Sequence, residues 1–116
     1  MAVILNQQAL ENARRLLDEG RYMINTVWGT SAPTHDEETD YVEKHGWGAY
    51  SAWYLGIDTD EPADSQAHYQ FPYGNFRKLH RSGVIAAKKR AAQNQYIDIV
   101  EGADDLLDLL DRMNAC

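Results

Sequence analysis

The sequence predicts a mainly α-helical fold of about five helices with a minor two-stranded β element, and a small single-domain α+β fold is the alternative. Two segments, near the two ends of the chain, repeat apolar residues at steps of three and four, as one face of a helix requires. A third segment opens with the spacing of a capping box. Extended propensity is confined to two short stretches, so we expect little sheet.

The chain has 116 residues, of which 44% are hydrophobic and 25% are charged. A chain of this length can bury one independent core, and its composition is that of globular proteins. We therefore expect one domain over residues 1–116. The start of the chain matches neither a signal peptide nor a membrane anchor, and the only cysteine is Cys116. These features predict a cytoplasmic protein with no membrane partner.

The first helix is expected to run from Asn6, as its N-cap, to about Glu19, with Gly20 as its stop. Its apolar face consists of Leu10, Ala13, Leu16 and Leu17. The next stretch, residues 21–28, is rich in β-branched and aromatic residues. It predicts one short strand before a turn that contains Ser, Ala and Pro.

Thr34 and Glu37 have capping-box spacing, so a second helix should begin at about His35 and end at Gly46. A short aromatic helix is expected next, closed by Gly56, because aromatic residues recur there at helical spacing: Trp47, Tyr50 and Tyr54. This segment contributes to an unusual content of three Trp and seven Tyr, which suits an interface or a core.

An acidic loop follows, and residues 68–73 return to extended propensity, with Pro72 favouring an edge strand. We expect this strand to pair with residues 21–28. A helical turn is then predicted from Asn75 to Ser82, and a further helix from Gly83 to about Asn94.

In that helix Lys88 falls in the middle of the apolar arc. We expect its stem to lie along the core and its ammonium group to reach water or an acid. The last helix should open at Asp98, with Glu101 at cap-like spacing. Its apolar face consists of Ile99, Ala103, Leu106, Leu110 and Met113, and its other side is acidic.

The charge is unevenly distributed. The chain carries a net charge of −7, yet residues 65–97 contain no acid and six basic residues, which we call the basic sector: Arg77, Lys78, Arg81, Lys88, Lys89 and Arg90. This sector could pair with the acids of its own chain, on the last helix or in residues 36–43. It could equally meet an acidic surface of another molecule, including a second copy.

Familiar chemical motifs are absent. Asp58, Asp60 and Asp64 do not fit a calcium loop, because Pro62 and Ala63 occupy positions that need a ligand and a glycine. The four histidines lack metal-ligand spacing, and no phosphate-binding or hydrolase signature occurs. We therefore predict no metal, no cofactor and no catalytic residue.

Two alternatives stay open. The aromatic residues between the cations could stack on bases, which would suit a nucleic-acid-binding accessory protein of a mobile element, although the net charge of −7 disfavours it. His80, flanked by Arg77 and Arg81, would be pushed towards its neutral form and could act as the general base of a small enzyme.

Residues 69–93 follow the pattern Y-x-F-P-x-G-[DN]-F-x-K-x-H-R-x-G-x-x-A-A-x-x-R-A-x-Q. Together with the preceding WGAYSAWYLGID, this stretch resembles a family of small uncharacterised bacterial proteins that also occurs in phage and mobile-element settings. The resemblance covers about half of the chain and implies no established activity. In that family Asp is the more usual residue at the position of Asn75.

We therefore predict a non-enzymatic binding or assembly module. Its basic and aromatic stretch, Phe71 to Arg90, should meet an acidic or anionic surface, in a homo-oligomer or on an acidic protein. A pocket is expected around these residues because packing alone does not require so many exposed polar groups together. The predicted binding residues are Tyr73, Asn75, Lys78, His80, Arg81 and Arg90.

Overall fold

Five α-helices surround two small β-sheets within residues 3–114, which are the residues that the computed structural model describes. Cys116 lies outside this range. The helices are α1 (Gln7–Asp18), α2 (Trp28–Ser31), α3 (His35–Ser51), α4 (Arg81–Gln93) and α5 (Ile97–Met113), and a short 3-10 helix spans Gln66–His68. The predicted mainly α fold with a minor β part is confirmed, and the β part is larger than expected.

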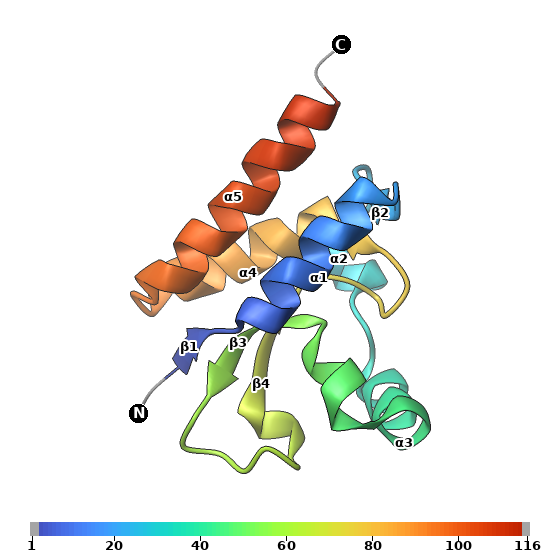
Figure 1. The fold of residues 1–116 in the computed structure, drawn as a ribbon, viewed down its shortest axis with the longest axis vertical. Helices are drawn as coiled ribbons and strands as arrows, with labels where there is room; N and C mark the ends of the chain where they lie inside the picture. Colours follow the sequence, from blue (N-terminus) through green and yellow to red (C-terminus); the bar gives the residue numbers. More distant parts are fainter. Residues whose placement is uncertain (1–2, 115–116) are drawn as a thin grey trace.

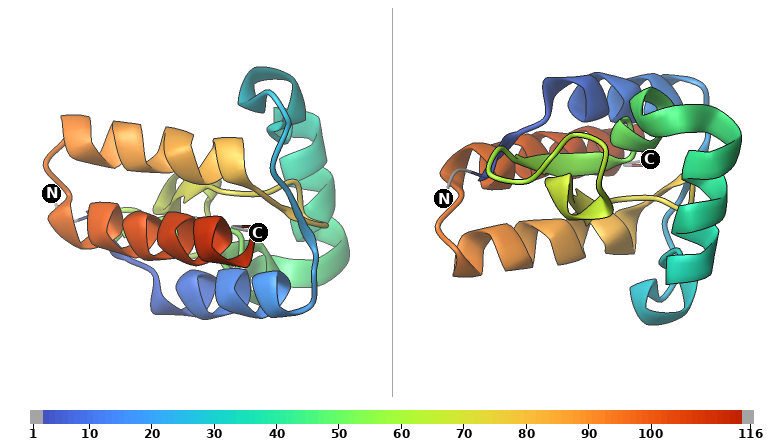
Figure 2. Two further views of the ribbon diagram at one scale, coloured as in Figure 1. Left: turned by 90° about the horizontal axis from the view of Figure 1, so that it is seen from above. Right: turned by 90° about the horizontal axis from the view of Figure 1, so that it is seen from below.

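The larger sheet has three antiparallel strands in the order β1 (Val3–Leu5), β3 (Tyr54–Asp58) and β4 (Tyr69–Pro72). Ile4 is paired with Ile57, and Gly56 is paired with Gln70. The smaller sheet joins β2 (Tyr22–Met23) to β5 (Leu79–His80) in parallel. Figure 2 shows α1, α5 and α4 side by side, with the larger sheet against them and α3 across their end.

The helix α1 begins after Asn6, as predicted, but the Asn6 side chain does not cap it. The side chain is buried and donates instead to the backbone oxygens of Ser51 and Tyr54, at 2.9 and 3.0 Å. It thereby ties the start of α1 to the end of α3. The α1 face predicted from periodicity is buried as expected: Leu10, Ala13, Leu16 and Leu17.

The capping box of α3 is present, with Thr34 and Glu37 bonded reciprocally. Gly46 has φ of 82° and ψ of 170°, which are not helical, so it ends the first helical segment of α3, as predicted. A second segment of α3 follows the kink and continues to Ser51. The helix α5 begins at Ile97 rather than Asp98, and Asp98 instead accepts a hydrogen bond from the Leu5 backbone N–H at 2.7 Å.

Three predictions about extended segments are wrong. Only Tyr22–Met23 of the expected strand at residues 21–28 is extended, and Trp28 begins α2. The expected pairing of residues 21–28 with 68–73 does not form, because β4 pairs with β3. The expected helix around Tyr54 is β3, the central strand of the sheet, where the absence of a side chain at Gly56 leaves room for the Phe71 ring.

The hydrophobic core lies between the larger sheet and the layer of α1, α4 and α5 (Figure 1). Its largest fully buried side chains include Tyr50, Tyr54, Tyr73, Leu55, Ile99 and Leu106. Much of the aromatic content is therefore core. None of the helices within residues 3–114 has the length and apolar character that crossing a bilayer requires.

Candidate functional site

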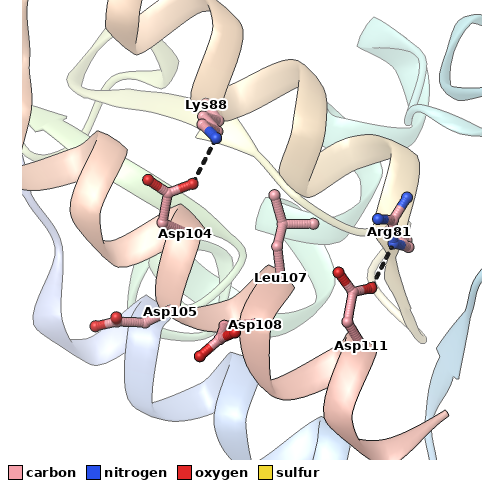
Figure 3. Close-up of a pocket in the computed structure, with 7 residues that line it drawn as sticks. All are labelled: Arg81, Lys88, Asp104, Asp105, Leu107, Asp108 and Asp111. Carbon is pink, nitrogen blue, oxygen red and sulfur yellow. Dashed lines mark hydrogen bonds and ion pairs between the residues drawn. The ribbon is translucent and has the colours of Figure 1, made fainter. Parts of the chain in front are cut away.

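Two cations of the basic sector pair with acids of α5, as the internal-pairing alternative expected. The Lys88 Nζ lies 2.6 Å from Asp104 Oδ1, and the Arg81 Nε lies 3.3 Å from Asp111 Oδ1 (Figure 3). The Lys88 ammonium thus reaches an acid, which is one of the two partners predicted for it. Arg81, a predicted binding residue, is engaged within its own chain.

The groove between these helices has a volume of about 430 Å³ and is dominated by acids. Asp105 and Asp108 line it together with the two ion pairs, and Leu107 lies between them (Figure 3). Among the described residues, no group of three or more His, Cys, Asp or Glu side chains is arranged to hold a metal ion. The two ion pairs on the walls of the groove join α4 to α5.

The other four cations of the basic sector are exposed and form no ion pair with any residue of the described range: Arg77, Lys78, Lys89 and Arg90. They lie in two separate places: Arg77 and Lys78 precede α4, and Lys89 and Arg90 lie near its end. Arg90 follows Arg81 by nine positions in α4, which places it about 13 Å further along the helix axis. Arg90 instead lines a hollow with Phe71 and Tyr96. The predicted single cluster around Arg81 and Arg90 is therefore divided between the two ends of α4.

Residues 73–80 fold back on themselves into a tight hairpin, where a helical turn was predicted. We call this segment the basic hairpin. The His80 N–H donates to the Tyr73 carbonyl at 3.0 Å, and the Asn75 N–H donates to the Lys78 carbonyl at 3.2 Å. At the tip, Asn75 Oδ1 accepts hydrogen bonds from the backbone N–H groups of Arg77 and Lys78, at 3.1 and 2.9 Å. This role needs an oxygen acceptor and no charge.

The rest of the tip is also fixed. Phe76 has φ of 66°, which is strained for a side-chain-bearing residue, and its ring stacks on Tyr41 at 4.3 Å between centroids. The Arg21 guanidinium donates to the Arg77 carbonyl at 2.7 Å. The backbone that carries Arg77 and Lys78 is thus held on several sides, while both side chains remain exposed.

Tyr73, a predicted binding residue, is fully buried at the base of the hairpin. Its hydroxyl donates to the Ala52 carbonyl at 2.7 Å and accepts from Asn12 Nδ2 at 2.8 Å. Burial raises the pKa of this phenol well above its usual value, so it stays protonated. Tyr73 therefore anchors the hairpin to the core and presents no surface to a ligand.

His80 ends the hairpin, opposite Tyr73, and is 4% exposed. Its Nδ1 is 2.8 Å from Thr26 Oγ1, which in turn is 3.3 Å from Ser82 Oγ. Its Nε2 is buried and has no hydrogen-bond partner within the described residues. Burial first, and the charge of Lys78 second, lower the pKa of His80 below 6.5, so the ring is neutral at neutral pH.

A pocket of about 360 Å³ lies between the hairpin and the segment that leads into α3. We call it the hairpin pocket; its lining residues are Thr30, Ser31, Ala32, Thr34, Glu37, Asn75, Arg77 and His80. A neighbouring hollow shares Glu37, Asn75 and Arg77 with it. The lining offers hydroxyl, amide and guanidinium donors, and a single carboxylate, which accepts from the Thr34 N–H at 3.0 Å.

The structure thus brings Asn75, Lys78 and His80 together on one hairpin, and separates them from Arg90. Arg77 and the hydroxyl-bearing residues 26–34 were missing from the predicted set. The signal that could have indicated them is the run N-T-V-W-G-T-S-A-P-T, which is rich in hydroxyl groups without helical or strand periodicity. No known protein family, curated protein or solved structure matches this chain.

Proposed function

We propose that this protein is a non-enzymatic binding module whose basic hairpin meets an acidic surface of a protein partner. The observation that carries the proposal is that the Arg77 and Lys78 side chains are exposed and unpaired among the described residues. Both are exposed, and neither forms an ion pair within residues 3–114, in a chain with a net charge of −7. Other cations of the basic sector, Arg81 and Lys88, have acids of their own.

The rigidity of the hairpin supports the same proposal. A cation on a fixed backbone loses less conformational entropy on binding than one on a mobile loop. Here the Asn75 side chain holds two backbone N–H groups of the tip, and the Phe76 ring is stacked on Tyr41. The hairpin is therefore prepared for contact with a partner of opposite charge.

The environment of His80 favours binding over catalysis. A general base becomes a charged imidazolium, which enzymes commonly stabilise with a carboxylate on the second ring nitrogen. The Nδ1 of His80 contacts the Thr26 hydroxyl and no carboxylate of the described residues, and burial and Lys78 lower the pKa of the ring. The general-base alternative is therefore less favoured, although the pocket beside His80 is present.

Fluorescence anisotropy of a labelled peptide of alternating Glu and Gly residues, at low salt, tests the proposal. Arg77→Ala/Lys78→Ala should weaken binding at least about fivefold, because two exposed charge contacts are lost. Lys89→Ala/Arg90→Ala is the matched control, since it removes two exposed, unpaired cations at the far end of α4 and should leave the affinity unchanged. Equal loss in both double variants, or tighter binding of a double-stranded oligonucleotide, would refute the hairpin as a site for acidic protein.

A second copy of the chain is one partner with the required surface, because the residues outside the basic sector hold five basic and eighteen acidic residues. Under this form of the proposal the oligomer should dissociate as salt screens the contact. Sedimentation velocity over a range of salt concentrations tests it. A monomer at every salt concentration would leave an acidic protein of another sequence as the partner.

A further inference from the structure

We propose that the hairpin pocket binds a carboxylate group, with His80 and Arg77 as its principal donors. This inference rests on the proposed function, since an acidic protein partner supplies such groups. Beyond the contacts of that partner with the exposed Arg77 and Lys78, one of its carboxylate groups would enter the hairpin pocket.

The first observation is the unsatisfied nitrogen of His80. The residue is 4% exposed, and its Nε2 has no partner within residues 3–114. A buried polar atom without a hydrogen bond is costly, and such atoms are rare in folded proteins. His80 is also one of the residues that line the hairpin pocket, and we place the missing partner of this atom there.

The hydroxyl contacts of His80 allow Nε2 to be a donor. If Ser82 donates to Thr26 and Thr26 donates to His80 Nδ1, the proton of the neutral ring lies on Nε2. The reverse direction would leave Nε2 as an acceptor. A carboxylate only accepts hydrogen bonds, so its binding selects the first arrangement.

The start of α4 favours an anion at the same place. This helix of 13 residues begins at Arg81, directly after His80, and has no acid in its first turn. The N-terminus of a helix carries partial positive charge, which stabilises nearby anions. In Figure 2 this end of α4 lies towards α2 and α3, whose residues form the opposite wall of the pocket.

Further donors complete the lining. Arg77 is exposed and free of ion pairs in the described part of the chain, and its guanidinium can bind a carboxylate through two N–H groups. The Ser31 side chain is half-buried and makes no hydrogen bond to another described residue. Glu37 is the one opposing charge in the pocket. Its removal should therefore strengthen the binding of a carboxylate, whereas it would weaken the binding of a cation.

Histidine side-chain ¹⁵N NMR during a titration with sodium acetate, at ionic strength held constant with sodium chloride, tests the inference. We expect saturable shifts of the His80 ring nitrogens and an increase of the tautomer with its proton on Nε2. Glu37→Gln should tighten acetate binding at least about threefold, and Arg77→Ala should weaken it by a similar factor. Lys89→Ala is the control and should have no effect.

Several results would overturn the inference. These are an unchanged His80 signal, the same shifts with chloride alone, weaker binding in Glu37→Gln, or tighter binding of inorganic phosphate through the same residues. The two proposals can also fail separately. If the acidic peptide requires Arg77 and Lys78 while acetate leaves His80 unchanged, the pocket assignment is wrong and the proposed function stands. If acetate binds and the peptide does not, the proposed function is wrong.

Discussion

Lys88 on α4 and Asp104 on α5 face each other at 2.6 Å between Nζ and Oδ1, across the contact between the last two helices. The sequence presents Lys88 as part of one basic stretch, but this pairing separates it from the cations that remain available to a partner. The basic sector therefore has two roles. Arg81 and Lys88 join α4 to α5, and Arg77 and Lys78 are left exposed on the hairpin.

We predict that Lys88→Met changes the free energy of unfolding by less than about 1 kcal/mol, because ion pairs between partly exposed side chains contribute little. The side chains of Lys88 and Asp104 are 40% and 50% exposed. Urea denaturation measures the change. Peptide binding should also be retained in this variant, while Arg77→Met should weaken it. Loss of binding in Lys88→Met would mean that the α4–α5 groove belongs to the site.

Asn75→Ala should lower the free energy of unfolding by roughly 1–2 kcal/mol, because the backbone N–H groups of Arg77 and Lys78 lose their acceptor. Asn75→Asp should stay close to the original stability, since its carboxylate oxygen can accept the same two hydrogen bonds. Thermal unfolding of the two variants compares them. If both substitutions cost the same, the oxygen of Asn75 does not hold the tip.

Substitution by alanine at two helical glycines should change the stability of the protein in opposite directions. A Cβ at Gly83 would lie 2.7 Å from both the Tyr73 carbonyl oxygen and the Trp28 ring, so Gly83→Ala should destabilise the protein by about 1–3 kcal/mol. At Gly48 no atom lies within 4 Å of an added Cβ. Gly48→Ala should therefore stabilise α3 by about 0.5–1 kcal/mol through helix propensity. A Gly83→Ala protein of unchanged stability would show that α4 can move away from Trp28 and the hairpin at little cost.

The stability of the protein should fall as the pH decreases below 6.5, the ordinary pKa of a histidine. Burial and Lys78 lower the pKa of His80 in the folded state, so the unfolded chain binds a proton first. The contribution of the neutral ring is complete above pH 6.5 and is lost as the pH falls through the lower, folded pKa. Urea denaturation at a series of pH values, from about 7.5 downwards, measures this loss.

The matched comparison for this prediction is His80→Gln against His68→Gln. His80→Gln should reduce the dependence of stability on pH in that range. His68 is half-buried at the end of the 3-10 helix, and His68→Gln should preserve the dependence. An unchanged dependence in His80→Gln would assign the effect to another group.

Features set by local sequence could be predicted. The buried faces of α1 and α5 follow from apolar residues three and four positions apart, and the start of α3 follows from the reciprocal bonds of Thr34 and Glu37. These two inferences need only the contacts of one helix turn. For Lys88, the place in the apolar arc predicted an ammonium group that reaches water or an acid, and the structure has the acid.

Features that depend on distant contacts were missed. Tyr54 stands at helical spacing from Tyr50, yet it lies in the central strand of a sheet. The residues paired with this strand lie 51 to 55 positions earlier in β1 and 12 to 18 positions later in β4. The basic hairpin was missed although it is local: the Asn75 side chain holds the turn, as Asn commonly does, where a helical turn was predicted. The surroundings of His80 come from Thr26, which is 54 positions away, and no local pattern contains this information.

Amide chemical-shift mapping with the peptide of alternating Glu and Gly residues tests the central claim most directly. If the basic hairpin and its pocket form the binding face, the largest shift changes should lie in residues 73–80 and 30–37. Residues 88–94 at the far end of α4 should change little. Changes centred on Lys89 and Arg90, or spread evenly over all exposed cations, would contradict the account.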